Sequence, residues 1–220
     1  MKKLFLSLLS LCLVTAAMAQ KKVVIETEYG KIVLALYDNT PKHRDNMVKL
    51  VEEKFYDSTL FHRVIPGFVI QGGDPDSKKA KVGQVLGGGD VGYKVPAEIN
   101  EENFHQRGAV GMARDNNPDK ASSGCQFYIV VGKKFTDEEL DNISQRNNRK
   151  FTPAQREIYK NAGGTPHLDG NYTVYGIVEE GMDVVDKIAA EPKDSTDRPR
   201  KDISMKKVTM KKKKKKFLFF

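Results

Sequence analysis

Short runs of hydrophobic residues, separated by glycine, proline and asparagine, dominate the central part of the chain. Residues 23–27 and 31–37 are rich in β-branched and aliphatic side chains, and Glu28-Tyr29-Gly30 between them predicts a hairpin turn. Further β-like runs lie at 60–65, 68–71, 109–113, 127–131, 173–178 and 203–210. The pattern therefore predicts a mainly β protein.

Two segments have helical spacing instead. Thr40-Pro41 combines a capping residue with a proline at the first helical position, and an apolar face follows. That face carries Met47, Leu50, Val51 and Phe55. A second amphipathic helix is predicted at 182–190. Its apolar side carries Met182, Val185, Ile188 and Ala189. Many short strands with two helices indicate a β-barrel or sandwich with helical plugs.

A further segment, at about 137–163, interrupts the β pattern. Thr136 to Glu139 and Thr152 to Gln155 both have the spacing of a capping box, and Gly163-Gly164 is a plausible stop. Two short inserted helices are therefore predicted, leaning on the body and less stable than the core. Their thin apolar face consists of Leu140, Ile143, Ile158 and Tyr159. The insertion either tunes substrate choice or is a passive surface elaboration.

Residues 1–19 have the features of a secretory signal peptide. Lys2 and Lys3 form a basic start, residues 4–14 are apolar but too few to span a bilayer, and Ala17-Met18-Ala19 fits a cleavage site. A retained apolar anchor is the alternative. No other segment has about 18 apolar residues, so we expect an exported, periplasmic protein without stable membrane insertion.

The formal net charge of +8 comes from the ends of the chain. Of 37 basic residues, eight are Lys2, Lys3 and the run 211–216, and the remaining 29 equal the 29 acidic residues. A neutral body argues against a nucleic-acid partner. Six consecutive lysines repel one another, so residues 211–220 are predicted to be a disordered tail without a catalytic role. The mature domain is expected at 20–210, as a monomer.

The sequence contains only poor matches to common catalytic and cofactor-binding motifs. Gly87 to Gly92 match a dinucleotide fingerprint, but an extended, proline-broken segment follows where a helix is required, so a loop is predicted. The four histidines show no metal-ligand spacing. Cys125 has no histidine beside it in sequence, which favours a small buried residue over a nucleophile, although a triad could still assemble in space. We expect neither cofactor nor metal.

Residues 61–74 differ from the other β segments, because they place Arg63 within otherwise apolar strands. An unpaired buried charge is expensive. The guanidinium must therefore be paired inside the structure or face a groove where a ligand accepts its hydrogen bonds. The sequence of this segment alone gives the two alternatives equal weight.

The same segment strongly resembles the signature of cyclophilin-type peptidyl-prolyl isomerases, F-H-R-hydrophobic-I-P-G-F-x-x-Q-G-G-D. The likeness covers roughly residues 22–210 and continues, in the family's order, through four further motifs. These are Gly108 to Ala113, Ser123 to Ile129, His167 to Gly170, and Tyr175 to Met182.

The resemblance implies an eight-stranded antiparallel β-barrel capped by two helices, here with an inserted helical segment, and a peptide groove on the barrel's outer surface. It assigns the catalytic set to Arg63, Gln71, Phe68 and Phe127. Phe68, Phe127 and Leu168 match the pocket for the proline ring. It assigns substrate contacts to His62, Val69, Ala113, Arg114, Gln126, His167, Leu168 and Tyr172. His167, Tyr172 and Arg114 depart from the residues that many members carry there, and His167 replaces a tryptophan that contacts cyclosporin.

Isomerisation needs no nucleophile, metal or cofactor, which agrees with the motifs. Rotation about an X–Pro bond faces a barrier of about 18–20 kcal/mol, because amide resonance must be broken. A guanidinium that donates to the proline nitrogen in the twisted state would lower this barrier. The expected partners are proline-containing polypeptides. A binding module that holds prolines without turning them over is the rival hypothesis.

Overall fold

The computed structural model describes residues 20–212. The predicted signal peptide and nearly all of the predicted lysine tail lie outside these residues. Lys211, the first residue of that predicted tail, still belongs to the folded body, because its N–H donates to Lys22 O at 2.8 Å. Its ammonium group pairs with Glu180 at 2.6 Å. None of the helices formed by residues 20–212 has both the length and the apolarity needed to cross a bilayer.

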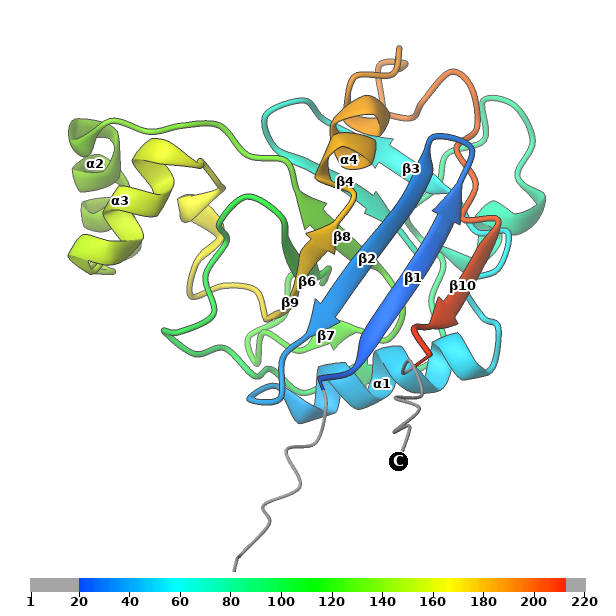
Figure 1. The fold of residues 1–220 in the computed structure, drawn as a ribbon, viewed down its shortest axis with the longest axis horizontal. Coiled ribbons are helices and arrows are strands. Elements are labelled where there is room, and N and C mark those ends of the chain that lie inside the picture. Colours follow the sequence, from blue (N-terminus) through cyan, green and yellow to red (C-terminus); the bar gives the residue numbers. More distant parts are fainter. Residues whose placement is uncertain (1–19, 213–220) are drawn as a thin grey trace, which may run out of the picture.

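Eight strands form one antiparallel sheet in the order β10-β1-β2-β9-β6-β8-β4-β3 (Figure 1). Their bounds are β1 Lys22–Thr27, β2 Gly30–Leu36, β3 Phe61–Val64, β4 Val69–Gly72, β6 Ala109–Met112, β8 Phe127–Val130, β9 Val174–Glu180 and β10 Lys207–Met210. A separate pair joins β5 (Lys94–Val95) to β7 (Ser122–Ser123), which the sequence pattern did not predict. The mainly β fold and its antiparallel sheet are confirmed.

The sheet is strongly curled rather than closed by a continuous ladder. The edge strands β3 and β10 are not paired with each other along their length. Instead, the start of β3 and the residue Thr59 before it bond to the segment that precedes β10. Phe61 N–H donates to Ile203 O at 2.9 Å, and Met205 N–H donates to Thr59 O at 2.8 Å. The predicted barrel is thus a curled sheet whose two edges meet through a few backbone hydrogen bonds.

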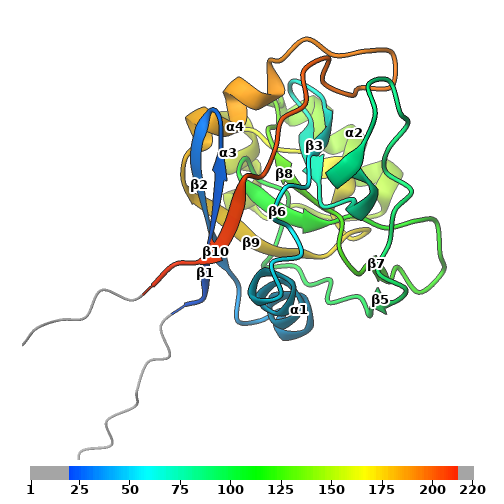
Figure 2. The ribbon, with the colours of Figure 1, turned by 90° about the vertical axis from the view of Figure 1, so that its right-hand side faces the viewer.

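Two helices cover the ends of the curled sheet, and Figure 2 shows α1 at the lower end and α4 at the upper end. Helix α1 (Pro41–Glu52) and helix α4 (Met182–Ala189) bury one apolar face each against the interior. Thr40 occupies the N-cap position of α1 and Pro41 its first position, as predicted, but the Thr40 side chain makes no capping hydrogen bond. The carboxylate of Glu98, distant in sequence, accepts from Lys42 N–H at 3.0 Å and His43 N–H at 2.9 Å instead.

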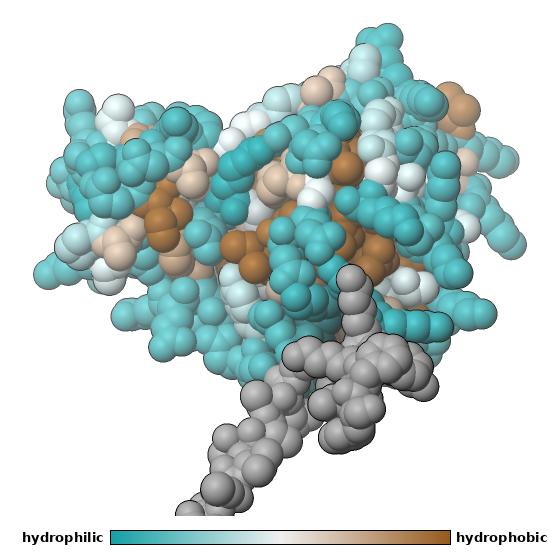
Figure 3. Space-filling model, in the orientation of Figure 1, coloured by the Kyte–Doolittle hydropathy of each residue, from teal (hydrophilic) through white to brown (hydrophobic). Residues whose placement is uncertain are grey.

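The inserted segment forms α2 (Asp137–Asn147) and α3 (Pro153–Asn161), and both predicted capping boxes are present. The two helices project from the body as a lobe with its own buried cluster (Figure 3). That cluster consists of Phe135, Leu140, Phe151 and Tyr159, with Phe104 and Ile143 packed against it. Four helices are therefore present among the described residues, two of them in the insertion.

The base of this lobe is tied to the body by backbone bonds. Gly163 O accepts from Arg107 N–H at 2.9 Å, and Thr165 N–H donates to His105 O at 2.8 Å. Gly164 pairs with Lys133 on the incoming arm. A Cβ at Gly164 would overlap His105 O and the Tyr159 ring, so only glycine allows this close approach. The short 3-10 helix Pro166–Leu168 then leads directly to the outer face of the sheet.

Candidate active site

The β3–β4 hairpin supplies the first three groove residues. Arg63 lies opposite Gln71 in its ladder, and the register is irregular between Phe61 and Arg63. Phe68 occupies the turn between the strands, where its N–H bonds Ile65 O at 3.0 Å. A short antiparallel connection therefore brings a cation, an aromatic ring and an amide to one face.

This face contains a cavity of about 170 Å³. It is lined by Arg63, Phe68, Val69, Gln71, Ala113, Arg114, Tyr128, Leu168 and Tyr172. The aromatic and aliphatic members belong to a hydrophobic cluster separate from the barrel interior. The cavity thus has an apolar floor with polar groups at its edge, an arrangement that suits a small apolar ring attached to a polar backbone.

Arg63 faces this cavity and is not a paired charge inside the wall. Its side chain is 39% exposed, and its guanidinium carbon lies 5.9 Å from the Phe68 ring centre. One carboxylate is near: Asp197 Oδ2 lies 3.6 Å from Arg63 Nε, on the side chain's inner nitrogen. The outer nitrogens of the fork make no hydrogen bond to any described residue, so they can donate to a ligand.

Asp197 is a candidate site residue that the sequence did not reveal. It lies in the 192–199 loop with φ +64°, and its carbonyl accepts from Val64 N–H at 2.9 Å. Lys193 Nζ donates to its other carboxylate oxygen at 2.6 Å. The loop thereby fixes a carboxylate beside Arg63, although no local motif marks it.

The assignment of Phe127 to the proline pocket is wrong. Phe127 points into the barrel, is 1% exposed, and packs edge-on against Tyr56 and Phe61. Its neighbour Tyr128 lines the cavity instead. Successive side chains of a strand point to opposite faces, so one position decides between core and groove.

Tyr128 is held in place from two sides. Gly111 lies opposite it in the β6–β8 ladder, and a Cβ at Gly111 would overlap the Tyr128 ring. The hydroxyl of Tyr128 is 2.8 Å from His105 Nε2. Burial raises the pKa of Tyr128 well above its ordinary value, so the hydroxyl keeps its proton and can donate it to His105.

A buried hydrogen-bond network continues from the pocket to the insertion. His105 donates to Asp169 Oδ1 from its backbone N–H at 2.9 Å and from Nδ1 at 2.6 Å. The hydroxyl of Tyr159, on α3, donates to Asp169 Oδ2 at 2.7 Å. Burial first and the Asp169 carboxylate second raise the pKa of Tyr159. The inserted helix is thereby linked to the floor of the pocket through fully satisfied groups.

A second cavity of about 340 Å³ adjoins the first and shares Gln71, Ala113 and Arg114 with it. The glycine-rich loop 87–89 forms its far wall, because Gln126 Nε2 donates to Gly87 O at 2.9 Å and Gly89 O at 2.8 Å. The segment is a loop, as predicted. Gln71 Nε2 donates to Gln126 Oε1 at 3.1 Å, so the amide of Gln71 is bonded to Gln126 and makes no hydrogen bond to Arg63.

Along this groove, some backbone N–H and C=O groups make no hydrogen bond to any described residue. Ala113 uses both its N–H, to Gln126 O, and its C=O, to Ser123 N–H, at 2.8 Å each. The next residue, Arg114, makes no backbone hydrogen bond to any described residue, while its Nε donates to Asn171 O at 2.8 Å. Ala113 therefore contributes its side chain to the groove, and Arg114 offers an unpaired backbone edge.

His62 and His167, which the resemblance assigns to substrate contacts, do not line the proline cavity. His62 is 4% exposed and lines neither cavity, so it does not contact a groove ligand. Burial lowers its pKa to about 4. His167 lies outside the first cavity but stacks on Phe68, with ring centres 5.5 Å apart. Tyr172, at the rim, stacks under the Arg114 guanidinium at 5.0 Å.

Cys125 is a buried structural residue, as predicted. It is fully buried, and burial raises the pKa of its thiol to about 11. A thiol with this pKa is almost entirely protonated near neutral pH and is a poor nucleophile.

Comparisons with known proteins agree with this geometry. The family model "Cyclophilin type peptidyl-prolyl cis-trans isomerase/CLD" matches residues 22–210. The chain therefore belongs to the cyclophilin family, and it is an enzyme of the isomerase class. More particularly, it is a cyclophilin-type peptidyl-prolyl cis-trans isomerase.

Relatives and a solved structure support this assignment. A probable peptidyl-prolyl cis-trans isomerase of Brucella suis is 37% identical over 79% of this chain and 74% of its own length. A putative bifunctional phosphatase/peptidyl-prolyl cis-trans isomerase of Streptococcus pyogenes is 36% identical over 83% of this chain. The matched region covers only 37% of that longer protein. The crystal structure of a Cryptosporidium parvum cyclophilin-type isomerase has the same fold, with TM-score 0.64, 24% identity, and coverage of 89% and 99% of the two chains.

Proposed function

We propose that the protein accelerates X–Pro rotation in exported, incompletely folded polypeptides and so assists their folding. The observation that carries the proposal is the half-exposed guanidinium of Arg63 at the edge of an apolar cavity of about 170 Å³. A proline ring held in this cavity would present its nitrogen to Arg63.

Arg63 would act on the twisted state of the bond. Rotation removes amide resonance, and the proline nitrogen then gains a lone pair that accepts a hydrogen bond. Neither planar isomer offers this acceptor, so the donated bond stabilises the transition state selectively. Arginine suits the role because it stays protonated and keeps a planar fork. Asp197 and the Phe68 ring would limit the orientations of this fork.

The rest of the groove would hold the chain while one side of the bond turns. Phe68, Tyr128 and Leu168 would surround the ring. The unpaired N–H and C=O of Arg114 would bond an extended peptide in the manner of an added strand. Because only backbone and a proline ring are recognised here, many unfolded polypeptides would qualify as substrates.

Export to the periplasm is part of the proposal and rests on the leader pattern of residues 1–19. Intact-mass analysis of secreted material should give a chain that begins near Gln20, whereas a retained Met1 would contradict export. We also propose that the enzyme works as a monomer, which sedimentation analysis tests.

Folding assistance is tested with a periplasmic protein whose slow refolding phase is limited by proline isomerisation. Catalytic amounts of the enzyme should accelerate that phase, since uncatalysed isomerisation takes tens to hundreds of seconds. An unchanged slow phase, together with turnover of short peptides, would contradict a folding role. Binding of proline peptides without turnover would support the rival binding-module hypothesis.

A further inference from the structure

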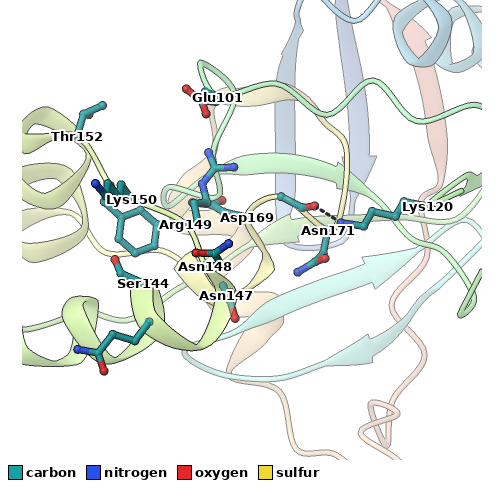
Figure 4. Close-up of a pocket in the computed structure, with 13 residues that line it drawn as sticks. Glu101, Lys120, Ser144, Asn147, Asn148, Arg149, Lys150, Thr152, Asp169 and Asn171 are labelled. Atoms are coloured by element: carbon teal, nitrogen blue, oxygen red, sulfur yellow. Dashed lines mark hydrogen bonds between the residues drawn. The ribbon is translucent and has the colours of Figure 1, made fainter. Parts of the chain in front are cut away.

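A cavity much larger than the proline cavity lies outside the proline groove. It measures about 840 Å³ and separates the inserted helices from the body (Figure 4). The C-terminal end of α2 and the segment that follows it, up to Thr152, form one wall. Lys120 and the loop 169–171 form the opposite wall, and Lys120 Nζ donates to Gly170 O at 2.7 Å. We call this space the insertion cleft.

The insertion cleft is positively charged. Lys120, Arg149 and Lys150 line it, against the acidic residues Glu101 and Asp169. Asp169 is already bonded to His105 and Tyr159, and it is 2% exposed. Three cations therefore face one available carboxylate, that of Glu101.

The guanidinium of Arg149 has no bonding partner in the part of the chain that the structure describes. Asn148 ends α2 in the left-handed conformation, and Arg149 N–H bonds Ser144 O at 3.0 Å. Among residues 20–212, no ion pair or side-chain hydrogen bond engages the guanidinium, and its Nε is shielded from solvent without an acceptor. The two outer nitrogens of Arg149 also make no hydrogen bond to any described residue, and Arg149 lines the cleft. They can therefore donate to a carboxylate that enters the cleft.

The insertion cleft and the proline groove share one dividing loop. Leu168 and Tyr172 face the proline cavity, while residues 169–171 line the insertion cleft. Arg114, on the groove, donates to Asn171 O at 2.8 Å. A polypeptide that occupies the groove therefore passes close to the cleft.

We propose that the insertion cleft binds an acidic side chain of the same polypeptide whose X–Pro bond lies in the groove. This deepens the proposed function and rests on it. The insertion supplies Arg149 and Lys150, so it selects substrates with acidic residues near the proline. A carboxylate fits better than a nucleic acid, because Glu101 would repel a polyanion and the body of the chain carries equal numbers of both charges.

Peptides that differ only in charge test the proposal. Each carries one X–Pro bond with a pair of Glu, Gln or Lys residues, placed two to six residues before or after the proline. For at least one placement, kcat/KM should be roughly fivefold higher with Glu than with Gln, as expected for a partly exposed charge pair. The advantage should shrink as salt is raised.

Variants locate the effect. Arg149→Gln combined with Lys150→Gln should bring the Glu-to-Gln ratio close to one. Arg146→Gln removes the same charge from an exposed position of α2 that does not line the cleft, and it should keep the wild-type ratio. Glu101→Gln should increase the ratio, because it removes the opposing carboxylate.

The outcomes separate this proposal from the proposed function. Equal rates for Glu and Gln peptides, or an unchanged ratio in the Arg149/Lys150 variant, would overturn the acidic cleft while turnover itself continues. If no peptide is turned over, the proposed function fails. Fluorescence anisotropy with a proline-free Glu-rich peptide then decides the cleft: binding that the double variant loses supports it, and equal binding by both proteins overturns it. Tighter binding of a single-stranded oligonucleotide than of this peptide would also overturn it.

Discussion

Phe127 and Tyr128 are neighbours on β8 with opposite environments, so conservative changes at the two positions should have different effects. Phe127→Leu keeps an apolar side chain in the core but removes two edge-on aromatic pairs, with Tyr56 at 5.6 Å and Phe61 at 6.3 Å. At about 0.5–1.5 kcal/mol each, these pairs predict a loss of about 1–3 kcal/mol in the free energy of unfolding. Because the ring is outside the cavity, kcat/KM should stay within about twofold of wild type.

Tyr128→Leu should lower turnover as well as stability. It removes the aromatic floor of the proline cavity and leaves His105 Nε2 without its partner. We expect kcat/KM to fall about tenfold, which corresponds to about 1.4 kcal/mol of lost interaction with the ring. Urea unfolding and a protease-coupled peptide assay measure both quantities for each variant. A Phe127→Leu protein with normal stability and a tenfold loss of kcat/KM would refute the placement of these two rings.

Three further predictions follow from buried or oriented groups. Tyr159→Phe leaves Asp169 Oδ2 without its donor, so urea unfolding should show a loss of about 1.5–3 kcal/mol, and a normal midpoint would contradict the network. His62 has a pKa of about 4 in the fold against about 6.5 when unfolded, so protons favour the unfolded chain between these values. The free energy of unfolding should therefore decline as pH falls from about 6.5 to 4, by about 3 kcal/mol from this group, and His62→Phe should flatten the decline in pH-dependent melts. Asp197→Asn tolerates the same left-handed backbone but removes the charge beside Arg63, so kcat should fall about two- to fivefold in the peptide assay, and an unchanged kcat would argue against a positioning role.

Local sequence signals predicted most of the fold. The Glu28–Gly30 turn between two β runs and the two threonine capping boxes depend on near neighbours, and each is present in the structure. Thr40 had the same local signal, but a distant carboxylate, that of Glu98, occupies the end of α1 instead. Long-range competition of this kind leaves no mark in the sequence near the helix.

The error at Phe127 has a physical cause. All four residues of β8 are buried, because the strand has the barrel interior on one side and the groove cluster on the other. Without polar residues in alternate positions, the sequence does not reveal which aromatic ring faces outward. Asp197 could not be found for a different reason: it lies in an irregular loop, and only the tertiary fold brings it to Arg63.

The central claim is that Arg63 stabilises the twisted X–Pro bond, and parallel measurement of kcat/KM and melting temperature for Arg63→Ala tests it most directly. The account predicts a kcat/KM lower by a factor of about 10²–10³, or about 2.7–4 kcal/mol, as when a transition-state donor is lost. The melting temperature should be nearly unchanged, because the side chain is 39% exposed and has one loose ion-pair partner. Arg63→Lys should recover only part of the rate, since an ammonium group lacks the planar fork. A folded Arg63→Ala protein with near-normal turnover would contradict the mechanism.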